Sequence, residues 1–269
     1  MPSFTGNISG QISGHLSSPS ERPATTALLA PAAAILLCSA VLITVIGQYT
    51  DLDLVLADLY FDQEKRVFPW NTTWFAKDFM HGWVKNTLRW LGFLILAATL
   101  LDFLRPLKGM SSLHRTQLRV LAIASFAEPF IVNSLKERSS MHCPWDVDRF
   151  GGSHSFLRLL DWVPDGWDPG HCFPAGHAST AMWLCTLAVF WLPHSPRKAF
   201  YAFLGGSGAG LFLGWIQQMR GQHFLTHTLW TSWISATLLL ILIAMFSRQL
   251  LVQIKPPVDQ ELQPAVCNP

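Results

Sequence analysis

Three polar clusters interrupt an otherwise apolar sequence, and their residue types suit chemistry on a phosphate group. The first is KERSSMHCPWDVDRFGG at 136–152, the second is FPAGH at 173–177, and the third is MRGQHFLTH at 219–227. Lysine and arginine can clamp the negative charge of a transferring phosphoryl group. Imidazole can attack phosphorus or protonate a leaving oxygen, because its pKa lies near neutral pH. The clusters therefore predict phosphoryl transfer by Lys136, Arg138, Arg149, His177, Arg220, His223 and His227.

The spacing within the clusters adds two local expectations. Gly176 would let backbone amides approach a phosphate where a helix begins, which is a natural anion site. His223 and His227 are four residues apart, so on a helix they would share one face. The same spacing occurs in helical metal sites, but the chain has no HExxH pattern. The sequence therefore predicts no metal and no other cofactor, with a metal-binding protein kept as an alternative.

The composition indicates what must position these clusters. Half of the 269 residues are hydrophobic and only 13% are charged, which is typical of a membrane protein. The formal net charge of +2 gives no reason to expect a nucleic-acid partner. We expect an all-α polytopic membrane protein, a six-helix transmembrane bundle. Judged against about 20 apolar residues per crossing, the spans lie at 26–47, 86–104, 116–135, 174–192, 200–217 and 225–246.

The remaining segments divide the chain into one domain and two tails. Residues 1–24 and 248–269 are polar or Pro-containing and predict disordered tails around a membrane domain at 25–247. The alternating acidic and apolar residues of 51–62 indicate a short interfacial helix. Glu128-Pro129 interrupts the third span, and a carboxylate within a membrane span is a candidate functional residue.

Basic residues in the short loops predict the orientation. Lysines and arginines gather in the loops after the second and fourth spans and in the tail after the sixth, so these should be cytoplasmic. Both termini then lie in the cytoplasm, and the three polar clusters face outward. The protein is expected in a bacterial inner membrane with its site facing the periplasm.

The clusters, in this order and on these spans, resemble the type-2 phosphatidic acid phosphatase superfamily over about residues 85–245. The signature of that family is Lys-x6-Arg-Pro, then Pro-Ser-Gly-His, then Ser-Arg-x5-His-x3-Asp. The resemblance assigns phosphate binding to Lys136, general acid catalysis to His177 and the nucleophilic role, with a phosphohistidine intermediate, to His223. The matching non-catalytic positions are Pro144, Pro174 and Gly176.

Several signature positions hold other residues in this chain. The first-motif arginine is Cys143, and the third-motif serine and arginine are Ile216 and Gln217. The second-motif serine is Ala175, and the aspartate that orients the nucleophile is His227. Three arginines are available as replacements, and His227 could accept a hydrogen bond from the His223 ring. The replacement arginines are Arg138, Arg149 and Arg220.

Two cysteines flank the resembling motifs on the same outer loop. Cys143 ends the first motif, and Cys172 precedes the second. In an oxidising compartment a disulfide between them would tie the first cluster to the second.

The resemblance implies a metal-independent phosphatase acting on a phosphorylated lipid, either a phosphate monoester or a pyrophosphate. A phosphotransferase that passes the phosphate to another lipid stays open. So does a binding or transport protein that kept the anion site without turnover, because an aspartate and two arginines of the signature are replaced.

Overall fold

The computed structural model describes residues 21–192 and 194–251, with side chains from residue 29 onward. No named strand occurs in this part of the chain. The predicted all-α membrane fold is confirmed, and the predicted tails lie largely outside the described residues. The α-helices are α1 (Glu21–Tyr49), α2 (Leu52–Asp58), α3 (Lys85–Leu104), α4 (Ser112–Lys136), α5 (Gly176–Met182), α6 (Pro196–Met219), α7 (Leu225–Met245) and α8 (Ser247–Leu251). A π-helix, η2 (Phe75–Val84), precedes α3, and 3-10 turns are η1 (Pro69–Thr72), η3 (Pro144–Asp146), η4 (Asp148–Phe150) and η5 (Trp183–Phe190).

Five of the described helical segments are long and apolar enough to cross a membrane, so this is an integral membrane protein. They are 29–49, 75–104, 112–136, 196–219 and 225–245. The fourth predicted span differs from the others: α5 has 7 residues and continues as the 8-residue 3-10 segment η5. The second span begins earlier than predicted, because η2 continues directly into α3.

The predicted interruption of the third span is absent. α4 runs through Pro129 without a break, as helices in a membrane can when neighbouring groups satisfy the freed backbone. Glu128 is buried against α7, where its Oε1 accepts a hydrogen bond from the Ser235 hydroxyl at 2.6 Å. Its Oε2 has no hydrogen-bond partner among the described residues. This contact joins α4 to α7 in the interior of the bundle.

α6 packs closely on its neighbours through glycines spaced four apart: Gly206, Gly210 and Gly214. A Cβ at Gly206 would collide with the backbone of Leu184 and Cys185, and one at Gly214 would collide with Thr228. Small residues at this spacing let membrane helices approach through their backbones. The sequence of α6 therefore fixes its distance from η5 and α7.

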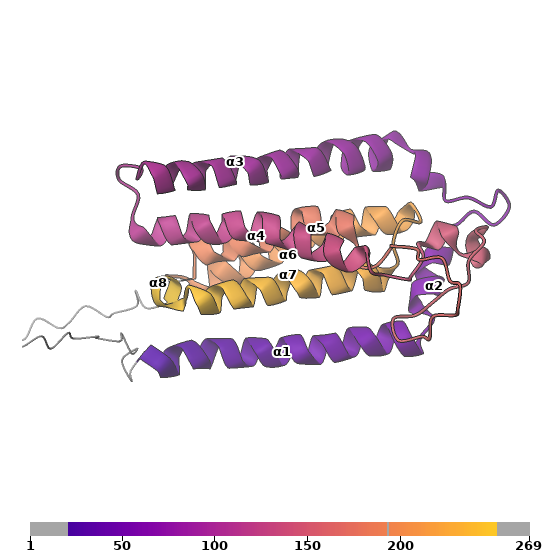
Figure 1. The fold of residues 1–269 in the computed structure, drawn as a ribbon, viewed down its shortest axis with the longest axis horizontal. Helices are drawn as coiled ribbons and strands as arrows, with labels where there is room; N and C mark the ends of the chain where they lie inside the picture. The colour runs from indigo at the N-terminus through magenta and orange to yellow at the C-terminus, as the bar shows by residue number, and fades with distance from the viewer. Residues whose placement is uncertain (1–20, 193, 252–269) are drawn as a thin grey trace, which may run out of the picture.

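The two ends of the helix bundle are built from different elements (Figure 1). The start of α1, the short α8 and the connection between α3 and α4 lie at one end, whereas α2 and the loops after α2 and α4 lie at the other. At the first end a buried salt bridge between Asp102 and Arg115, at 3.1 Å, ties α3 to α4. The loop end holds the polar clusters.

Candidate active site

The three polar clusters meet at the loop end of the bundle. Lys136 ends α4, Gly176 and His177 begin α5, and His223 lies in the short loop between α6 and α7. The ring centres of His177 and His223 are 6.0 Å apart. The Lys136 Nζ lies 4.0 Å from the position that a Cβ on Gly176 would take. The fold thus places an ammonium group and two imidazoles around the first turn of α5.

The loop that carries His223 needs a glycine at its tightest point. Gly221 ends α6 with a φ of 69°, a left-handed conformation that favours glycine. A side chain there would also collide with the ring of Phe68. The Gly221 carbonyl accepts a hydrogen bond from the Trp145 amide at 3.1 Å. This bond links the first cluster to the third.

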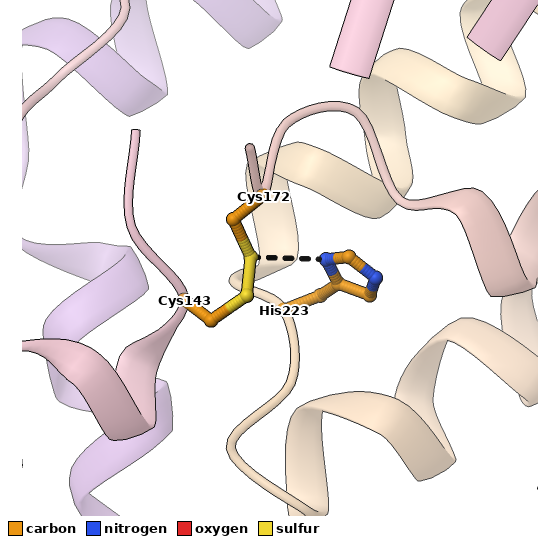
Figure 2. Close-up of side chains that lie close together, drawn as sticks. All are labelled: Cys143, Cys172 and His223. Atoms are coloured by element: carbon orange, nitrogen blue, oxygen red, sulfur yellow. Dashed lines mark hydrogen bonds between the residues drawn. A yellow bond between two sulfur atoms is a disulfide. The ribbon is translucent and has the colours of Figure 1, made fainter. Parts of the chain in front are cut away.

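A disulfide lies directly against the His223 ring (Figure 2). It joins Cys143 to Cys172, and the Cys172 Sγ is 3.5 Å from His223 Nδ1. A disulfide sulfur carries no hydrogen, so in this contact it can only accept. A hydrogen bond across this contact therefore has Nδ1 as its donor, which leaves Nε2 with the lone pair that a nucleophile needs.

Burial keeps His223 neutral. The side chain is almost fully buried, and this desolvation lowers the pKa of His223 well below its ordinary value. The nearby His227, His177 and Lys136 lower the same pKa further, whereas a hydrogen bond to the Cys172 backbone opposes them. A neutral imidazole at physiological pH is the reactive form for attack on phosphorus.

The hydrogen bond expected between His223 and His227 is not formed. Their ring centres are 5.9 Å apart, and among the described residues no hydrogen bond joins the two rings. The four-residue spacing failed to predict this contact because His223 lies outside the helix, in the loop before α7. The disulfide and the Cys172 backbone contact His223 instead.

Arg220 is the arginine that the fold brings next to the histidine loop. Its guanidinium is buried and donates to Gln217 Oε1 at 2.9 Å and to Asn71 Oδ1 at 3.2 Å. Both partners are neutral, and its Nε has no hydrogen-bond partner among the described residues. Burial lowers the pKa of Arg220, and Asp78 opposes this effect. In the described part of the chain, no carboxylate is hydrogen-bonded to the Arg220 guanidinium.

The other two predicted arginines form contacts away from the two histidines. Arg149 forms an exposed ion pair with Asp58 of α2, with its Nε 3.0 Å from the carboxylate. Arg138 is exposed and donates to the Ser134 carbonyl at 2.7 Å. The structure does not bring either guanidinium into contact with His177 or His223. Sequence distance could not reveal this, because Asp58 lies 91 residues from Arg149.

Three residues that the sequence reasoning missed surround His177. Lys85 Nζ lies 3.5 Å from His177 Nε2, and the His81 ring lies tilted by 37° against the His177 ring, with their centres 4.2 Å apart. Arg89, one helical turn after Lys85, lines the same cavity as His177. This cavity of about 360 Å³ lies between α3, α4 and α5. A signal was present, since Lys85 and Arg89 are basic residues four apart at the start of an apolar run.

Asp53 of α2 holds the start of α7 in place. The carboxylate is buried and accepts hydrogen bonds from the Thr226 amide, at 2.9 Å, and from the Thr226 hydroxyl. Phe224, which precedes α7, offers no side-chain cap of its own. Asp53 therefore acts as the N-cap of α7 from a distant segment. Burial raises the pKa of Asp53, although the bonds from Thr226 oppose this rise.

We expect Asp53→Ala to destabilise the protein by about 1–2 kcal/mol, the usual cost of losing an N-cap, and to lower activity because the His223 loop leads directly into α7. Thermal unfolding in detergent and a phosphate-release assay would measure the two effects. Asp58→Ala is the matched control, because it removes a carboxylate from the same short helix but breaks only an exposed ion pair. Equal losses in the two variants would contradict the capping role of Asp53.

One group of side chains has the spacing of a metal site. A sulfur from each of Cys143 and Cys172 and a ring nitrogen of His223 lie within 4.8 Å of one another. Metals bind the thiolate form of cysteine, and here both sulfurs are joined in the disulfide. In this oxidised form the three residues do not fit a metal.

Comparisons with known proteins give the family of this part of the chain. A model of the PAP2 superfamily matches residues 117–250. Over these residues the chain belongs to the PAP2 superfamily. The crystal structure of the first transmembrane PAP2-type phosphatidylglycerolphosphate phosphatase from Bacillus subtilis is similar to this chain, with a TM-score of 0.45 and 16% sequence identity. The similarity covers 83% of this chain and 97% of that one. No curated protein matches the chain.

Membership of the PAP2 superfamily supports a phosphatase-type function. The structure also shows what the residues at two replaced signature positions contact. Gln217 stands where the signature has an arginine, and here it accepts a hydrogen bond from Arg220. Ala175 stands where the signature has a serine, and it is fully buried against α7. Position 217 of this PAP2 chain therefore holds a neutral glutamine, and the positive charge lies three residues later, on Arg220.

Proposed function

We propose that this protein is a membrane phosphatase that hydrolyses a lipid phosphate through a phosphohistidine on His223. One observation carries the proposal. His177 and His223, which are 46 positions apart in the sequence, have ring centres 6.0 Å apart, beside the ammonium group of Lys136. Burial and the nearby cations lower the pKa of His177 to about 2 in the free protein, and the negative charge of a bound phosphate would favour its protonated form. A neutral His223, a protonated His177 and the neighbouring cations then provide the nucleophile, the proton donor and the charge stabilisation of phosphoryl transfer.

The reaction uses groups of this chain alone. Lys136, Arg220 and the Gly176 amide hold the phosphate oxygens. The lone pair on His223 Nε2 forms a bond to phosphorus as the bond from phosphorus to the leaving oxygen breaks. His177 gives its proton to that oxygen. Water then attacks the phosphohistidine, His177 takes a proton from the water, and inorganic phosphate leaves with His223 restored.

The surroundings of the site favour an amphiphilic substrate at the outer membrane face. The cavity beside His177 has cationic groups at one end and apolar side chains between α3 and α4, such as Phe93 and Phe126. A headgroup can lie among the charges while the acyl chains stay in lipid. The disulfide beside His223 supports an oxidising compartment, hence a periplasmic site in a bacterial inner membrane.

The test is phosphate release from a panel of lipid phosphates by purified protein in detergent, with chelator present. We expect release to be unaffected by the chelator. Release that stops with chelator and returns with added metal would contradict the metal-independent route. Transfer to an added lipid acceptor in place of release would indicate the phosphotransferase, and binding with no turnover would indicate the binding protein.

A further inference from the structure

The disulfide beside His223 and the His223 ring together contain the donor atoms of a metal site. The Cys143 sulfur, the Cys172 sulfur and a ring nitrogen of His223 all lie within 4.8 Å of one another (Figure 2). The Cys172 sulfur is 3.5 Å from Nδ1 of the ring. In the oxidised protein the two sulfurs are bonded to each other. Reduction would free both of them, and thiolate sulfur is a strong metal ligand.

The distances suit a tetrahedral zinc ion once the disulfide is broken. With zinc–sulfur bonds of about 2.3 Å and a zinc–nitrogen bond of about 2.1 Å, neighbouring ligand atoms of a tetrahedron lie roughly 3.6–3.8 Å apart. The 3.5 Å between the Cys172 sulfur and Nδ1 is already close to this spacing. The Cα atoms of the two cysteines are 5.2 Å apart, so rotation of the side chains can separate the sulfurs without moving the backbone. Two sulfurs and an imidazole favour zinc over magnesium or calcium, which prefer oxygen ligands.

The surroundings give access to the disulfide and favour the thiolate form. Cys143 is half-buried, so a small reductant can reach the bond from its side, whereas Cys172 and His223 are buried. The positive charge of Lys136 acts on the His223 ring, which the disulfide contacts. A cation near a thiol stabilises its thiolate.

We propose that reduction of Cys143 and Cys172 creates a zinc site that includes His223 Nδ1, and that zinc bound there stops phosphoryl transfer. The inhibition rests on the proposed function, whereas the metal site depends only on the three side chains. A dithiol gives two electrons and two protons to the disulfide, whose bond breaks while the dithiol forms its own disulfide. Zinc then displaces both thiol protons and binds Nδ1, and the proton of Nδ1 moves to Nε2. Water takes the fourth position on zinc.

Zinc on Nδ1 would remove the lone pair that His223 needs as a nucleophile. In the oxidised protein the contact with the disulfide leaves that lone pair on Nε2. A neutral imidazole carries one proton, so zinc on Nδ1 places this proton on Nε2. Lys136 and the Gly176 amide are not ligands, so a phosphate group can still bind. The expected effect is therefore a fall in kcat with little change in substrate binding.

The test measures bound metal in the full chain, purified in detergent. One sample stays oxidised, and a second is reduced with a phosphine under anaerobic conditions, because dithiols bind zinc themselves. Both are desalted, given zinc sulfate and freed of unbound metal. We expect one more zinc per chain in the reduced sample than in the oxidised one. Cobalt(II) in place of zinc should give the absorption of a thiolate-bound, four-coordinate ion in the reduced sample alone.

Phosphate release gives the second measurement. Zinc should lower release by the reduced protein at least about 100-fold relative to the same protein without metal, as the loss of an enzymatic nucleophile does. A chelator should restore the value of the reduced, metal-free protein. Zinc should leave release by the oxidised protein unchanged.

Two variants assign the histidine ligand. His223→Ala keeps the disulfide, and after reduction it should bind zinc at least about 100-fold more weakly, because even an outer-shell partner of a metal ligand is worth about 10- to 100-fold. His171→Ala is the matched control and should bind zinc like the native protein. His171 is adjacent to Cys172, but its ring contacts the Lys136 carbonyl.

Each outcome decides a separate part of the inference. Equal zinc in the oxidised and reduced samples would overturn the site, as would native affinity in reduced His223→Ala. Bound zinc with unchanged phosphate release would overturn the inhibition. No release by the oxidised protein from any lipid phosphate would overturn the proposed function, while the zinc and cobalt measurements would still decide the metal site.

Discussion

Replacing His223 with alanine is expected to abolish phosphate release, by a factor on the order of 10⁴ or more, as for the loss of other enzymatic nucleophiles. The imidazole lies 6.0 Å from that of His177 and presents Nε2 as its free nitrogen. No other described nucleophile replaces it, because both Cys143 and Cys172 are in a disulfide and His227 does not reach its position. Release of inorganic phosphate under initial-rate conditions would measure the loss.

The intermediate makes this prediction more specific. A brief incubation with lipid substrate labelled in its phosphate should leave label on the native protein. A phosphohistidine is stable in base and labile in acid, so the label should follow that pattern. His114→Ala is the matched control, because His114 lies at the other end of the bundle, where its amide is capped by Ser111. Full activity in His223→Ala would contradict the assignment, as would label on that variant.

Breaking the disulfide is expected to cause the largest loss of stability. The bond closes a segment in which the cysteines are 29 positions apart. Removing a crosslink of this length costs roughly 3–4 kcal/mol through the entropy of the unfolded chain. Cys143→Ser with Cys172→Ser should therefore lower the midpoint of thermal unfolding in detergent.

Activity should fall as well, because the Cys172 sulfur contacts His223 Nδ1 and the bond ties the first cluster to the second. A dithiol reductant should lower the activity of the native protein and leave that of the double variant unchanged. Cys38→Ser, in the exposed face of α1, is the control and should behave like the native protein. Two free thiols at positions 143 and 172 in protein purified without reductant would contradict the bond.

The features that depend on local sequence were predictable. Apolar runs of about the length that crosses a bilayer give helices wherever they occur, since backbone groups in lipid must be paired within the segment. That reasoning placed α1, α4, α6 and α7 within a few residues. The residue types of Lys136, His177 and His223 predicted phosphate chemistry before any contact was known. The fourth span was less predictable, because its 3-10 segment packs backbone to backbone against Gly206 of α6.

The tertiary structure decided which charges belong to the site. Periodicity assigns residues to a helix face but does not say which other helix that face meets. Lys85 reaches His177 across 92 positions, and Asp53 reaches Thr226 across 173. Arg149 does not contact the two histidines, because its guanidinium forms an ion pair with Asp58 of α2. The sequence by itself determined a helical membrane protein with the side chains for phosphoryl transfer. Only the tertiary packing brought Lys85 of α3 next to His177 and Asp53 of α2 to the start of α7, because both contacts join segments far apart in the sequence.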